Sequence, residues 1–147
     1  MPVYPEQEYL ESIGRCAYGI SSIEWLLLGD LPRLNTESSN LSLEKLNGLS
    51  TGQIAQTVRN EVEKVSDPET QAYIKACGEA LGVLARKRND ILHARPATID
   101  GQQRLFRWAP GRSNSKPHAI TLDILKDLEA LIQQTSRHLN SLRPEIS

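Results

Sequence analysis

The sequence predicts an all-α fold, a bundle of four to five helices with a small β-hairpin inserted between the third and last long helices. Three observations lead to this prediction. Apolar residues recur every three or four positions over long segments. Ser, Thr or Asp stand where the later segments begin, and Gly or Pro stand where segments end. The length of 147 residues is that of one domain, so we expect residues 1–147 to share a single core.

The first helix is expected over residues 6–28. Gly29 and Pro32 follow it and are typical of a helix stop. The next stretch, to residue 50, is rich in Asn, Ser and Thr and predicts a long connection with one short helical turn at 43–46. The apolar stripe of the first helix consists of Leu10, Ile13, Ala17, Ile20, Ile23 and Leu27.

Two further helices are expected over residues 51–66 and 67–93. Ser50 or Thr51 can cap the first of them, because a hydroxyl accepts from backbone N–H groups of the first turn. The second begins at Asp67 and Pro68, an N-cap followed by a proline in the first turn. Gly78 and Gly82 lie four residues apart on it and favour close approach of another helix. Its stripe consists of Ile74, Cys77, Leu81, Leu84, Arg88 and Ile91.

The periodicity changes from helical to extended after Pro96. Residues 97–99 and 102–108 predict a hairpin, and Asp100-Gly101 between them suits a type I′ turn. Alternation places Phe106 and Trp108 on one face, which we expect to be the buried one, and Arg107 on the other. A polar loop is expected at 110–117, and a last helix begins after its cap at Thr121 and ends before Pro144.

Composition bounds the classes of function. Hydrophobic residues make up 39% and charged residues 24%, as in a soluble globular protein. The sequence lacks a membrane-spanning run and a signal peptide, and we expect a cytoplasmic protein without membrane contact. Cys16 and Cys77 have no Cys or His at metal-ligand spacing, so we expect buried reduced thiols and neither a metal site nor a cofactor. Glycine-rich phosphate loops and serine nucleophile elbows are absent.

The net charge of −1 conceals a strong segregation. Residues 86–118 hold eight Lys or Arg against two Asp or Glu, a net charge of +6, whereas the rest of the chain sums to −7. Such asymmetry can mark an anion-binding face. Phe106 or Trp108 could offer a stacking face to an RNA base, as the alternative to burial in the hairpin. Candidate contacts to an RNA backbone are Arg86, Lys87, Arg95, Arg104, Arg107, Arg112 and Lys116.

Within this segment Arg88, Asn89 and His93 combine the residue types that RNA cleavage requires. A histidine can take a proton from a 2′-hydroxyl or give one to the leaving 5′-oxygen. An arginine can hold the scissile phosphate and stabilise charge that grows in the transition state. The internal 2′-hydroxyl needs no metal to attack.

Helical geometry constrains this pair. Five residues at 100° each separate Arg88 from His93 by about 140° around a helix, so the two side chains diverge. Either the helix frays before Pro96 and His93 turns toward Arg88, or a second chain completes the site across a two-fold axis.

The pattern of an arginine, a polar residue, three further residues and a histidine, at the end of a long helix in a small helical protein, resembles the HEPN superfamily (higher eukaryotes and prokaryotes nucleotide-binding). The resemblance implies a HEPN-like helical bundle, often a homodimer with a composite cleft that cleaves RNA without metal. Arg88 and His93 would then be catalytic and Asn89 would support them. It further implies a toxin or phage-defence effector, with an antitoxin or defence-system protein as partner. Relatives paired with a nucleotidyltransferase antitoxin often carry a tyrosine two residues after the histidine; Arg95 occupies that position here, so adenylylation is not implied.

A structural explanation stands beside the catalytic one. Arg88 can form a buried salt bridge to Asp90 or to a glutamate of the first helix, and His93 can cap its helix. His118 and His138 have no neighbours of ligand type and are expected in surface or capping roles. The two hypotheses are therefore a metal-independent endoribonuclease and a non-catalytic HEPN-like module for dimerisation, partner-protein binding or nucleotide binding.

Overall fold

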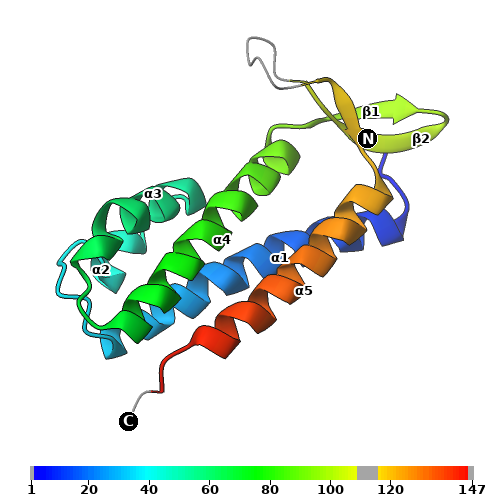
Figure 1. Ribbon diagram of the computed structural model, residues 1–147. Helices are drawn as coiled ribbons and strands as arrows, with labels where there is room; N and C mark the ends of the chain where they lie inside the picture. Colours follow the sequence, from blue (N-terminus) through cyan, green and yellow to red (C-terminus); the bar gives the residue numbers. More distant parts are fainter. Residues whose placement is uncertain (1, 109–115, 146–147) are drawn as a thin grey trace.

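The computed structural model describes residues 2–108 and 116–145 and is mostly helical with a small antiparallel sheet (Figure 1). The prediction of a largely helical chain with an inserted hairpin is confirmed in this form, although the sheet gains a strand. In order, the elements are α1 (Gln7–Asp30), η1 (Leu31–Arg33), α2 (Leu43–Leu46), α3 (Thr51–Glu61), η2 (Val62–Lys64), α4 (Pro68–Leu92), β1 (Arg95–Ile99), β2 (Gln102–Arg107), β3 (His118–Ile120) and α5 (Leu122–Leu142).

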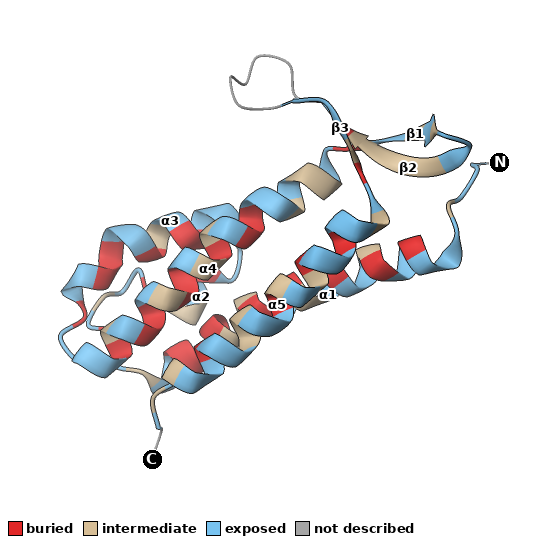
Figure 2. Cartoon of the chain, turned by 45° about the vertical axis from the view of Figure 1, so that its right-hand side comes forward, coloured by how far each residue is buried: buried red, intermediate tan, exposed pale blue. Residues whose placement is uncertain are grey.

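The three long helices α1, α4 and α5 run alongside one another, and α3 covers α4 (Figure 1). Their buried residues face inward between the helices (Figure 2). Burial of this apolar surface is the main force that holds the helices together. The largest fully buried side chains are Tyr9, Ile20, Ile23, Leu27, Leu41, Leu46, Ile54, Tyr73, Ile74, Leu81, Leu84 and Ile120.

The helix starts that the sequence predicts are confirmed. Ser50 accepts from the Gln53 backbone N–H while the Gln53 side chain accepts from the Ser50 N–H, a complete capping box. Asp67 accepts from the Thr70 backbone N–H at 2.9 Å, and Thr121 caps α5. These contacts satisfy backbone donors that have no partner inside the helix.

Two predicted helix ends are wrong. Helix α1 does not stop at Gly29 but continues through Asp30 into η1, where Pro32 fits because the start of a helical turn needs no N–H donor. Helix α3 ends at Glu61 rather than at residue 66, and η2 tightens the chain before Val65 turns extended. Glu61 accepts from Asn40 and Ser38 of the long connection, which fixes this end.

The hairpin forms where the sequence places it, but a third strand joins it. Asp100 and Gly101 both have positive φ, of 52° and 76°, as a type I′ turn requires. Strand β2 pairs with β1 on one side and with β3 on the other, Arg107 lying opposite His118. Three residues of β3 are too few to show a period in the sequence, and much of the predicted polar loop, residues 110–115 with Arg112, lies outside the described residues.

The expected orientation of β2 is wrong. Arg107 is buried, with 8% of its surface exposed, whereas Trp108 is 63% exposed. Leu105, on the same face as Arg107, packs against the core, and Arg107 Nε lies 3.3 Å from Asp90 Oδ1 of α4. An ion pair allows a guanidinium to face the helices, where an unpaired charge would be costly.

Asp30 is a buried carboxylate that joins four elements. It accepts from Tyr73 Oη of α4 at 2.6 Å, from Arg33 of η1 at 2.7 Å, and from Arg143 after α5 at 2.7 and 2.8 Å. Burial raises its pKa, but the hydrogen bonds from Arg143, Tyr73 and Arg33 outweigh this and hold the pKa below its usual value. No local pattern in the sequence indicates this role of Asp30.

The two cysteines are free and buried, as predicted. Burial raises the pKa of the Cys16 thiol to about 11 and that of the Cys77 thiol to about 12. Both thiols are therefore protonated and unreactive at neutral pH. Within residues 2–108 and 116–145, none of the helices has the length and apolar character needed to cross a membrane.

The Asp30 network predicts acid sensitivity. Because the folded pKa is below the unfolded one, this contribution to stability is present above about pH 4 and is lost as the pH falls through the folded pKa. Asp30→Asn should lower the free energy of unfolding at pH 7 by about 2 kcal/mol and flatten its decline below pH 4. Urea unfolding from pH 7 to pH 3 measures both, with exposed Asp127→Asn as control; equal pH profiles for the two variants would refute this account.

Substitution of Gly78 tests how closely α3 packs on α4. A Cβ at Gly78 would clash with Val58 Cγ1, whereas a Cβ at Gly82 would meet Ala55 at 3.8 Å, an ordinary contact. Gly78→Ala should cost about 1–3 kcal/mol because α3 must move. Gly82→Ala should be neutral or stabilising by up to about 1 kcal/mol, since alanine favours helix. Chemical denaturation of both variants decides; a Gly78→Ala protein as stable as Gly82→Ala would contradict the predicted packing.

Candidate functional site

The predicted catalytic residues lie in the last turns of α4, which extends past α3 toward the sheet (Figure 1). Helix α3 begins at Thr51, at the level of Arg88, so the final turn of α4 has no cover from α3. Leu92 shares the Arg88 side of the helix and is 59% exposed there. This leaves an uncovered apolar side chain beside the predicted site.

Arg88 is half-buried and is held by a polar chain rather than by an ion pair to Asp90. Its Nη1 donates to Thr51 Oγ1 at 3.2 Å, and the Thr51 hydroxyl in turn donates to Glu24 of α1. Within the described part of the chain this is its one side-chain hydrogen bond, so most of its five N–H donors remain for other acceptors. The predicted alternative of a salt bridge to Asp90 is wrong, because Asp90 pairs with Arg107.

His93 is exposed and does not turn toward Arg88. Helix α4 stays regular through Leu92, and the His93 backbone N–H bonds to Asn89 O at 2.9 Å as the helix cap. Arg86, Asn89 and His93 therefore share the outer face, away from Arg88. A frayed helix end, the first of the two predicted ways to bring Arg88 and His93 together, is not found.

The predicted RNA contacts divide into two groups. Arg86, Lys87, Arg95 and Lys116 are exposed. Arg104 instead donates to both carboxylate oxygens of Glu6 at 2.7 and 2.8 Å and lies 4.5 Å above the Tyr9 ring. Since Arg107 is bound to Asp90, both of these arginines hold the sheet against the helices.

A hollow of about 320 Å³ adjoins the last turns of α4 and adds a residue that the sequence did not place there. His118 of β3 lines it, opposite Lys87 and Asp90 of α4. His118 is exposed, and its Nδ1 lies 2.9 Å from the carbonyl oxygen of Lys116. Only the pairing of β3 with β2 brings His118 here, and no local pattern in the sequence signals that pairing.

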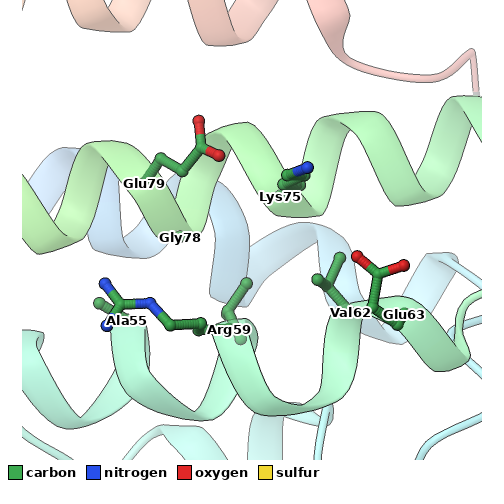
Figure 3. Close-up of a pocket in the computed structure, with 8 residues that line it drawn as sticks. Ala55, Arg59, Val62, Glu63, Lys75, Gly78 and Glu79 are labelled. Carbon is green, nitrogen blue, oxygen red and sulfur yellow. The ribbon is translucent and has the colours of Figure 1, made fainter.

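A second hollow, of about 140 Å³, lies between α3 and α4 and holds none of the predicted site residues (Figure 3). Its floor is apolar, with Ala55, Val62 and Gly78. Charged side chains line it from both helices, among them Arg59 and Lys75. Glu63 and Glu79 balance these two cations, so this hollow has no net charge that would favour an anionic ligand.

Comparison of the chain with protein-family models, with curated proteins and with solved structures gave no match. In the ranges 2–108 and 116–145, no three His, Cys, Asp or Glu side chains gather in a way that could hold a metal ion. The candidate site at the end of α4 thus consists of Arg88, which is hydrogen-bonded to Thr51, the exposed His93 and the exposed cations around them.

Substitution of Thr51 tests whether its hydroxyl group positions Arg88. Thr51→Val removes the hydroxyl that accepts from Arg88 and donates to Glu24, and should lower stability by about 1–3 kcal/mol. Thr51→Ser retains the hydroxyl and should recover most of the loss. Denaturant unfolding of the two variants makes the measurement, and equal stabilities would show that the polar chain contributes nothing.

Proposed function

We propose that the chain is a metal-independent endoribonuclease of HEPN type, with Arg88 and His93 in a site that a second copy completes. The observation that supports this most is the uncovered last turn of α4. It carries the exposed His93, the exposed Leu92 and the half-buried Arg88. Among the described residues Arg88 makes one side-chain hydrogen bond, so most of its N–H donors are available to a ligand. Within one chain Arg88 and His93 diverge, so a reaction that needs both requires a second copy.

In this mechanism His93 acts as general base or acid on the RNA 2′-hydroxyl or the leaving 5′-oxygen. Arg88 of the partner subunit binds the scissile phosphate, and its hydrogen bond to Thr51 fixes its direction. Asn89, on the same outer face as His93, supports the histidine. Arg86, Lys87 and Arg95 are exposed around it and hold the RNA backbone. In a cell, such cleavage suits a toxin or a phage-defence effector with a cognate partner protein.

One observation favours a second candidate function. The chain from Arg88 through Thr51 to Glu24 ties α4, α3 and α1 together, which gives the arginine a structural reason for its position. The second candidate is a non-catalytic HEPN-like module that dimerises or binds a partner protein or nucleotide.

RNA cleavage in EDTA separates the two candidates. We expect the wild type to cut a structured RNA and His93→Ala to lose at least about a hundredfold in rate, because general acid–base catalysis contributes about 10²–10⁴. His138→Ala changes an exposed histidine on α5 and should retain full activity. An inactive wild type, or a His93→Ala protein as active as His138→Ala, supports the non-catalytic module.

Mixing two inactive variants tests the composite site. Arg88→Ala and His93→Ala should each be inactive alone, yet an exchanged mixture should recover about one quarter of the wild-type rate. Half of the dimers are then mixed, and each has one site with both side chains intact. A mixture as inactive as its components, although mixed dimers form, would place both residues of each site in one chain.

A further inference from the structure

The solvent-facing side of α1 differs from that of the other long helices. We call it the outer face of α1; it consists of Leu10, Gly14, Tyr18, Ser21 and Trp25, all exposed and spaced by four or three residues. At 100° per residue these five positions fall within about 80° of the helix circumference, opposite the buried side. Tyr18 is 80% exposed and Trp25 57%.

This outer face carries no charged residue. Between Arg15 and Asp30 the only charged side chain of α1 is Glu24, which is half-buried and accepts from Thr51. The exposed sides of α4 and α5, by contrast, carry residues such as Lys75, Glu79, Asp127 and Arg137. A helix that is apolar on the core side and uncharged on the other has the pattern of a helix covered on both sides.

We propose that a second copy of this chain covers the outer face of α1, the two helices packing antiparallel about a two-fold axis. The sizes of the side chains along the outer face of α1 fit this arrangement. With the axis between residues 19 and 20, Trp25 lies across from Gly14 of the partner subunit, and Tyr18 lies across from Ser21 of the partner subunit. A Cβ added at Gly14 would meet nothing within 4 Å, so space is open where the indole would be received.

Charge at the two ends of α1 favours the antiparallel direction. At the N-terminal end, Glu8 and Glu11 of α1 and Glu129 of α5 share two cations, Arg15 and Lys126, which leaves one negative charge in excess. At the other end two guanidinium groups, of Arg33 and Arg143, share the single carboxylate of Asp30 and leave one positive charge in excess. An antiparallel pair places the acidic end of one copy beside the basic end of the other, whereas a parallel pair would place Glu11 beside Glu11.

The exposed aromatic rings supply part of the area that a specific contact needs. A Tyr or Trp side chain buries about 150–250 Å², so the exposed fractions of four rings in a dimer supply roughly 500 Å². Stable interfaces bury about 1,200 Å² or more in total. The remaining area would come from Leu10, Ala17, Ser22 and the flanks of a helix of 24 residues.

This contact goes beyond the proposed function, because it uses another face of the molecule. The outer face of α1 points away from α4 and α5, and a two-fold axis there leaves the two His93 side chains far apart. A chain that makes both this contact and the one at the end of α4 forms an assembly larger than a dimer. The two contacts can therefore be broken separately.

Disulfide cross-linking tests the arrangement in the full chain. Ser21 lies next to the proposed axis, within the short Cα separation that a disulfide requires. We expect Ser21→Cys to form a covalent dimer rapidly under mild oxidation, while Gln134→Cys, exposed on α5, stays largely monomeric. The native thiols are buried and should not contribute. Equal cross-linking of the two variants would overturn the proposal.

Two further variants identify the contact. Adding Trp25→Glu to Ser21→Cys should slow cross-linking by at least about tenfold, the effect of losing about 1.4 kcal/mol of association. Leu92→Glu, at the end of α4, should not slow it. Circular dichroism checks that each variant is folded, and light scattering gives its mass. A monomeric wild type, or cross-linking that Trp25→Glu does not slow, would refute the α1 contact whether or not the chain cleaves RNA.

Discussion

The arrangement of the helices depends on one buried carboxylate. Asp30 lies where α1 turns into η1, and donors from α4 and from the residue after α5 converge on it. A charge in this position is stable only because Tyr73, Arg33 and Arg143 all donate to it. Its demand for several donors at fixed directions selects one relative placement of these helices, which apolar packing alone would specify less sharply. On the same helix α1, Glu24 accepts from Thr51 at the start of α3, and Thr51 accepts from Arg88 of α4.

Local patterns were sufficient for most of the fold. The spacing of apolar residues and the caps at Ser50, Asp67 and Thr121 identified every long helix, because these signals arise within a few residues of sequence. The predicted helix end at Gly29 was wrong, because α1 continues to Asp30, which is buried and bonded to other elements. Local reasoning also failed at Arg107: alternation in β2 placed Phe106 and Trp108 on the core side, but the face that carries Leu105 and Arg107 packs on the helices.

The sequence indicated which residues form the candidate site, but not which distant residues of the chain contact them. Arg88 on an apolar stripe and His93 at a helix end are visible in the sequence, and their divergence follows from helical geometry. Thr51, which holds Arg88, lies 37 residues away, and His118 reaches the same end of α4 only through the pairing of β3 with β2. Such contacts depend on tertiary structure, so a local pattern cannot supply them.

The pairing of the first long helix with the last has a consequence for how the chain folds. Tyr9 of α1 bonds to Ile120, and Ser12 and Arg15 bond to Glu129, across more than 100 residues of sequence. Helical proteins usually fold fast because their contacts are local, whereas closing a loop of this length costs chain entropy before any contact repays it. Helix α4 can cover part of the apolar side of α1 earlier, but the part that α5 buries stays exposed until α5 has been made. We expect this chain to fold more slowly than its helical content alone would suggest, with the docking of α5 on α1 as the late step.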